Sequence, residues 1–123
     1  MFRWFGQKAD KRIKDSVFGE VRRRRDGLWE AQATLPGEVM PIDVLIPSGG
    51  KAPDEAYAEL FRSLPRRFES ASEAVDEGLG VLYIELLSEE EAGFWFGWTA
   101  SHDDTLYFVR TSPAGVIVEV SGD

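Results

Sequence analysis

Apolar and polar positions alternate along three stretches in the first half of the chain. Residues 17–25 and 28–35 follow the two-residue period of a strand, and Asp26-Gly27 between them is a strong signal for a hairpin turn. A third alternating stretch covers Met40 to Ile46, where Pro41 favours an edge strand or a later strand start. We therefore expect three strands in this half.

A two-residue loop at Asp26-Gly27 predicts the register of the first hairpin. It places Arg23 opposite Glu30 and Arg24 opposite Trp29, which would give an ion pair and a cation–aromatic contact. The face expected to enter the core then holds Phe18, Trp29, Ala31, Ala33 and Leu35, and the face expected to meet water holds Arg23, Arg25, Glu30, Gln32 and Thr34.

The middle of the chain shows helical spacing. Apolar residues recur at three and four positions from Tyr57 to Leu64, after a possible N-cap at Asp54 and before a helix stop at Pro65. A second apolar stripe, which predicts a long second helix, consists of Phe68, Ala71, Val75, Leu79, Leu82 and Leu86. The alternative is a strand over residues 81–87, because glycines at 78 and 80 disfavour a helix there.

Three further strands are expected at residues 94–99, 105–110 and 116–120, separated by turn-forming residues. The whole pattern predicts an α+β fold: an antiparallel sheet of about six strands in the order βββ-αα-βββ, with the helices packed on one face. Residues 1–14 alternate aromatic and basic side chains and are expected to form an arm, and residues 15–123 a single domain.

Composition and charge narrow the function classes. The 123 residues include no cysteine and one histidine, which excludes disulfide scaffolds, thiolate metal sites and multi-histidine metal sites within one chain. No apolar run is long enough to span a membrane, and the N-terminus lacks a signal-peptide pattern, so we expect a cytoplasmic protein. The net charge of −8 is uneven: residues 1–25 carry 9 − 3 = +6 and residues 26–123 carry 5 − 19 = −14.

Few motifs carry chemistry. Ser48-Gly49-Gly50-Lys51 lacks both the earlier glycine and the following Ser or Thr of a phosphate loop. His102, with Asp103 and Asp104, would suit a metal ligand or a general base, although the segment is a short connection between expected strands, where Asp and Ser are ordinary turn formers. The arginines at 22–25 would point alternately to two faces of a strand beside an acidic body, which disfavours nucleic-acid binding. We expect no catalytic residues, no metal and no cofactor.

The aromatic residues exceed what one core needs. Trp95 and Tyr107 are expected on the far face of the sheet, where such side chains serve as interface anchors. With Arg23 and Arg25 they form the candidate partner surface.

Two motifs, Asp15-Ser16-Val17-Phe18-Gly19-Glu20-Val21 and Leu28-Trp29-Glu30-Ala31, carry a family resemblance over residues 15–64. This part of the chain resembles small bacterial domains of unknown function, in families similar to the immunity proteins of polymorphic toxins. The resemblance implies a cytoplasmic, non-catalytic module that occludes a partner, and the acidic body suits a basic toxin. Two alternatives are a small enzyme or ligand-binding domain that uses His102 and nearby carboxylates, and a structural homo-oligomer paired through sheet edges or Trp95.

Overall fold

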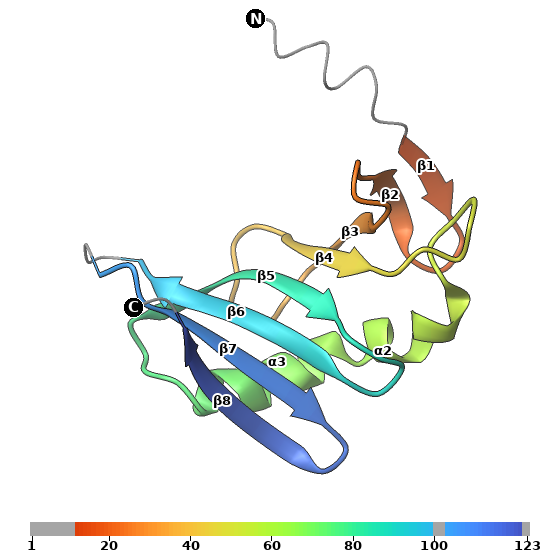
Figure 1. Ribbon diagram of the computed structural model, residues 1–123. Helices are drawn as coiled ribbons and strands as arrows, with labels where there is room; N and C mark the ends of the chain where they lie inside the picture. The colour runs from red at the N-terminus through yellow and green to blue at the C-terminus, as the bar shows by residue number, and fades with distance from the viewer. Residues whose placement is uncertain (1–11, 100–102, 122–123) are drawn as a thin grey trace, which may run out of the picture.

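A computed structural model of the chain describes residues 12–99 and 103–121 (Figure 1). The elements, in chain order, are β1 (Arg12–Asp15), β2 (Gly19–Arg23), β3 (Trp29–Ala33), β4 (Ile42–Ile46), the 3-10 helix η1 (Glu55–Tyr57), α2 (Ala58–Arg62), α3 (Leu64–Glu73), β5 (Leu79–Leu86), β6 (Ala92–Trp98), β7 (Leu106–Ser112) and β8 (Gly115–Ser121).

All eight strands belong to one sheet, in which each strand lies next to its neighbours in the chain. Every pairing is antiparallel except that of β4 with β5, which is parallel because the helices intervene between these two strands. The helices lie on one side of the sheet, as Figure 1 shows, and the other side has no covering layer among the described residues. The expected six-stranded antiparallel sheet in the order βββ-αα-βββ is therefore wrong, although the fold is α+β.

The largest correction concerns the second predicted helix. Helix α3 ends at Glu73, and residues 79–86 form strand β5 instead of continuing the helix. A bulge between Val81 and Tyr83 shifts the register of this strand against β6. The bulge leaves Leu79 and Leu86, which are seven positions apart, both packed on the core, as they would be in a helix, but it turns Leu82 of the predicted stripe away from the core, where it is 47% exposed.

Strand β1 was not expected, because it is only four residues long and lies in the segment assigned to the arm. A tight turn returns the chain to β2: the Asp15 carboxylate accepts hydrogen bonds from the backbone N–H groups of Val17 and Phe18 at 2.8 and 3.0 Å. The chain enters β2 at Gly19, whose φ of 79° favours glycine. The sheet thus includes residues 12–14, while the rest of the expected arm lies outside the described residues.

The hairpin between β2 and β3 forms where expected, but its register differs by one residue. Arg24 N–H donates to the carbonyl oxygen of Leu28 at 2.8 Å, so the loop has three residues and ends at Gly27, with a φ of 92°. Arg22, and not Arg23, lies opposite Glu30, and Arg23, and not Arg24, lies opposite Trp29. The expected pairing partners of Arg23 and Arg24 are therefore wrong, whereas all five residues of the expected core face are buried.

The core lies between the sheet and the helices. Asp54 caps η1 as expected, accepting a hydrogen bond from Ala56 N–H at 3.0 Å. Pro65 occupies the first turn of α3, where its missing N–H costs nothing, so it opens the next helix as well as ending α2. The ring of Phe68 packs on Phe94 and Phe96 of β6, with centroid distances of 6.1 and 6.3 Å. None of the helices in the described ranges has the length and apolar character needed to cross a membrane.

Candidate functional site

The sheet face opposite the helices, here called the open face, carries a hollow of about 480 Å³ over β3 to β5 and the connection between β2 and β3. Register places Glu30 of β3, Leu45 of β4 and Glu85 of β5 in one row across this face. The hollow is lined by Arg24, Asp26, Leu28, Glu30, Asp43, Leu45, Leu82, Tyr83 and Glu85. These residues come from three strands and the connection between β2 and β3, so only the assembled sheet brings them together.

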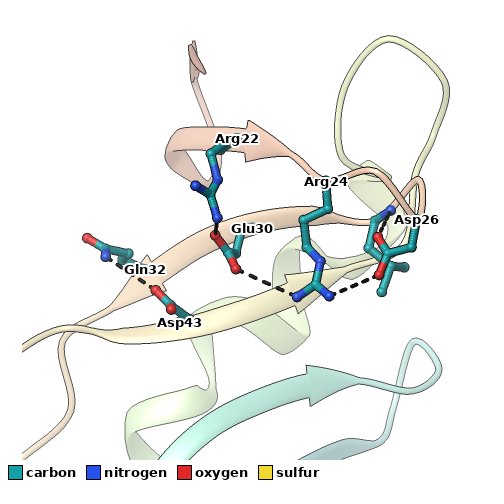
Figure 2. Close-up of polar contacts among 7 residues, drawn as sticks. Arg22, Arg24, Asp26, Glu30, Gln32 and Asp43 are labelled. Atoms are coloured by element: carbon teal, nitrogen blue, oxygen red, sulfur yellow. Dashed lines mark hydrogen bonds and ion pairs between the residues drawn. The ribbon is translucent and has the colours of Figure 1, made fainter. Parts of the chain in front are cut away.

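One wall of the hollow is a charged network (Figure 2). Glu30 lies between two arginines: it accepts a hydrogen bond from Arg22, and its second carboxylate oxygen lies 3.7 Å from Arg24 Nη1. Arg24 also reaches the carboxylate of Asp26, 3.0 Å from its Nη2. The one-residue difference in register explains this network, because it turns Arg22 and Arg24, rather than Arg23 and Arg25, to the open face.

Two other carboxylates of the hollow are bonded to neutral donors. Asp43 accepts a hydrogen bond from the amide of Gln32 at 3.3 Å, as Figure 2 shows, and Glu85 accepts one from the indole Nε1 of Trp95 at 2.8 Å. Neither donor cancels the charge of its acceptor. The lining residues hold four carboxylates and one guanidinium, a formal charge of 1 − 4 = −3, and Arg22, which is bonded to Glu30 from beside the lining, brings the sum to 2 − 4 = −2.

An aromatic row continues the open face beyond the hollow. The rings of Tyr83 and Trp95 stack with a centroid distance of 6.0 Å, and Trp95 contacts Phe108 at 4.7 Å. Tyr83 and Trp95 are half-buried, whereas Phe108 is buried because its ring lies over Gly93. The row thus presents the edges and faces of two amphipathic aromatic side chains to solvent.

The bulge in β5 shapes the meeting point of the hollow and the aromatic row. It places Leu82 beside Tyr83 on the open face, where the Leu82 side chain lies close to Gly97 of β6. Leu82 is 47% exposed, an unusual position for a leucine in an interior strand. Bulges commonly redirect side chains next to functional surfaces, and this one adds an apolar group to the rim of the hollow.

Burial raises the pKa of the Tyr83 hydroxyl, and the negative charge of Glu85 raises it further, while Arg24 acts in the opposite direction. The phenol therefore stays protonated throughout the physiological pH range. It can donate one hydrogen bond and accept others at the edge of the hollow.

The structure separates the four residues of the expected partner surface. Trp95 lies on the open face, but Tyr107 is paired with Phe96 and packs against the core on the helix-covered face. The expectation that Trp95 and Tyr107 share a face is therefore wrong. Arg23 lies over the Trp29 ring at 5.8 Å, on the core side, and Arg25 is exposed in the hairpin loop.

Sequence reasoning missed Leu82, Tyr83 and Glu85 because they fell within the second predicted helix. The signal available for them was the alternative interpretation of the same segment: β-branched and aromatic residues directly after Gly78-Leu79-Gly80. Leu45 was expected only as part of a strand, and nothing local marks it as the floor of a hollow.

His102 lies outside the described residues. Its neighbour Asp103 forms a local turn, in which its carboxylate accepts the backbone N–H of Thr105 at 2.9 Å. Hydrogen bonds from the side chain and backbone of Thr105 lower the pKa of Asp103, because they stabilise the ionised form. Within residues 12–99 and 103–121 no three His, Cys, Asp or Glu side chains are grouped so that they could hold a metal ion.

Comparison with known proteins supplies no relative: no family model, curated protein or solved structure matches the chain.

Proposed function

We propose that this protein is a non-catalytic protein-binding module whose open face binds a partner with basic side chains. The single observation that carries the proposal is the arrangement of the open face, where an acidic hollow adjoins an exposed apolar and aromatic rim. The helices cover the opposite face of the sheet, so the open face is the larger accessible surface of the described sheet.

The rim supplies the apolar contact that a protein interface needs. Leu82 is half exposed, and beside it Tyr83 and Trp95 offer rigid rings that lose little conformational entropy on binding. Because Trp95 is held by Phe108 and by the hydrogen bond to Glu85, its orientation is set before a partner arrives. Preorganisation of this kind reduces the entropic cost of association.

The charge of the hollow indicates which side chain enters it. A lysine or arginine from the partner would meet the carboxylates of Asp43 and Glu85, whose present donors are neutral. The Tyr83 ring at the edge of the same hollow is suited to a cation–aromatic contact. The net charge of −8 would in addition attract a basic partner over longer distances and raise the association rate.

The resemblance of residues 15–64 to families similar to immunity proteins supports the same class of function. If the protein acts as an immunity protein, its partner is a basic toxin. The module then neutralises the toxin by covering its surface, without catalysing a reaction. Two of the residues that carry the resemblance, Phe18 and Trp29, are buried in the core. They therefore support the fold, and the binding specificity would come from the open face.

The test is co-expression with the products of the neighbouring genes, followed by co-purification and measurement of the dissociation constant. We expect Asp43→Lys, which reverses an exposed charge in the hollow, to weaken binding at least tenfold, because a repulsive pair replaces an attractive one. Leu82→Ala should weaken it through loss of apolar contact.

The matched control is Glu59→Lys, the same kind of charge reversal on the exposed surface of α2. It should leave the dissociation constant unchanged. Equal losses from Glu59→Lys and Asp43→Lys would show that only the overall charge matters, and a partner that protects the helices instead of the open face would overturn the proposal.

A further inference from the structure

The two edges of the sheet differ in a way that the proposed function does not explain. The β1 edge is four residues long, and three of them, Arg12, Lys14 and Asp15, are charged. Short, charged edge strands are how proteins prevent unwanted pairing of sheets. The β8 edge is seven residues long and carries one charge, Glu119. Among the described residues, the β1 edge is thus protected against pairing, and no strand covers the β8 edge.

Strand β8 has a row of valines on one face and one large apolar side chain, Ile117, on the other. Val116, Val118 and Val120 follow the helix-covered face, next to Thr111, Val109 and Tyr107 of β7, and Ile117 lies on the open face beside Arg110. Val120 and Ile117 are 69% and 58% exposed. Strand β8 is the last strand of the sheet, so its row of valines extends the core as far as the edge of the sheet.

We propose that β8 pairs antiparallel with β8 of a second copy of this chain, so that two sheets join into one continuous sheet across a twofold axis. A second copy is the favoured occupant because the strand is complementary to itself. In a continuous sheet, the side chains of directly opposite residues lie on the same face, whereas neighbours along one strand lie on different faces. The twofold axis must therefore place one residue opposite its own copy, and cannot lie midway between two neighbouring residues.

Of the possible centres, Val118 uses the whole strand. It places Val118 opposite itself, Val116 opposite Val120, and Ile117 opposite Glu119 of the second copy, and it gives every residue of β8 a partner. Centring on Glu119 would oppose two like charges directly, and centring on Ile117 would move Val120 opposite the turn residue Ala114. The register centred on Val118 therefore joins the two valine rows on the helix-covered face.

Charge supports the same register. Arg110 lies 3.7 Å from Glu119 of its own chain, and Arg110 Nε is buried with no hydrogen-bond partner among the described residues. With Val118 at the axis, Glu119 of the second copy lies beyond Ile117, about two strand spacings or roughly 10 Å from the Arg110 backbone. Two long side chains bridge that distance, so each arginine would face two carboxylates instead of one.

A seven-residue edge pairing is at the small end of specific interfaces, so we expect a weak dimer, with a dissociation constant on the order of 10 μM. Sedimentation of the full chain should show the apparent mass rising from monomer to dimer across this range. Val118→Lys, which opposes two like charges at the axis, should raise the dissociation constant at least tenfold. Val39→Lys is the matched control, because Val39 is 97% exposed in a turn away from β8.

A cysteine crosslink tests the register without depending on the stability of Val118→Lys. The chain has no cysteine of its own, so each introduced thiol is unique. Val118→Cys should form a disulfide-linked dimer on mild oxidation, because the two thiols lie on directly opposite residues. Val120→Cys, although its position is more exposed, should crosslink at least tenfold more slowly, because its two copies would be offset by four residues along the strands.

A chain that stays monomeric up to several hundred micromolar would overturn the proposal, as would equal crosslinking rates for the two cysteine variants. Equal dissociation constants for Val118→Lys and wild type would place the contact elsewhere. None of these outcomes depends on the open face, so the proposed function is tested separately.

Discussion

The contact between Gly93 and Phe108 determines whether the aromatic row of the open face keeps its arrangement. A Cβ atom added at Gly93 would lie 2.1 Å from Cζ of the Phe108 ring and 2.3 Å from Cε1. Carbon atoms in ordinary contact are about 3.5 Å apart, so the ring would have to move by about 1.4 Å. Phe108 is buried against Trp95, which leaves the ring little room for this movement.

We therefore predict that Gly93→Ala destabilises the protein. Overpacking of this kind costs about 1–3 kcal/mol, and alanine regains about 0.5–1 kcal/mol in a strand because it is less flexible than glycine when unfolded. Because the overlap with the Phe108 ring is severe, we take the upper part of that range, about 2–3 kcal/mol, for the cost. The net loss in the free energy of unfolding is then about 1–2.5 kcal/mol, which corresponds to a melting temperature roughly 4–8 °C lower for a domain of this size. Thermal unfolding followed by circular dichroism measures it.

Gly97→Ala is the matched control, on the same strand and the same face. Its Cβ would lie 3.2 Å from Leu82 Cδ1 and 3.4 Å from Leu106 Cδ2, which are the ends of flexible side chains. Neither glycine has a positive φ, so backbone strain does not distinguish the two substitutions. We expect Gly97→Ala to be neutral or slightly stabilising.

The double variant Gly93→Ala/Phe108→Ala isolates the steric cause. In the absence of the Phe108 ring, the added methyl group at position 93 has no clash, so the Gly93→Ala change should cost nothing in that background. Equal melting temperatures for Gly93→Ala and Gly97→Ala, or an equal cost of Gly93→Ala with and without the Phe108 ring, would refute the reasoning.

Three further predictions concern the core, the charged network and pH. Phe94→Ala removes a fully buried ring that packs on α3 and should lower the free energy of unfolding by about 3–5 kcal/mol in urea denaturation. Glu30→Gln removes the negative charge that two partly exposed arginines share, and should lower the free energy of unfolding by about 1 kcal/mol, and by less in 1 M salt. Urea denaturation at two salt concentrations measures both values. Because burial and Glu85 raise the pKa of Tyr83 in the folded state, its contribution to stability is fully present below about pH 10, the unfolded value, and is lost as the pH rises through the folded value. Glu85→Gln keeps an oxygen for the Trp95 indole and should lower the Tyr83 pKa in an NMR titration, whereas an unchanged pKa would exclude the electrostatic cause.

The hairpin shows how far local pattern reaches. Asp26-Gly27 located the turn, and the alternation around it identified Trp29 and Ala31 as core residues, because burial follows the two-residue period of a strand. The register was beyond local pattern, since a loop of two or of three residues fits the same dipeptide. One residue of difference exchanged Arg23 for Arg22 as the partner of Glu30, and with it the composition of the open face.

The site was less predictable than the fold. Of the four residues expected on a partner surface, the structure places Trp95 on the open face and none of the other three. The hollow draws its residues from β3 to β5 and the connection between β2 and β3, and its lining depends on the parallel pairing of β4 with β5, which joins segments about 40 residues apart in the chain. Contacts of this range leave no periodic signal in either segment.

By itself, the sequence determined the α+β class, the positions of most strands and the capping of the first helical turn at Asp54, because these depend on neighbours within a few residues. The tertiary structure decided that residues 79–86 form a strand. A helix and the bulged strand both place Leu79 and Leu86 on the core side, so these positions do not distinguish the two, and the backbone pairing with β4 and β6 favours the strand, which turns Leu82 outward. That pairing also creates the open face and leaves β8 at an edge.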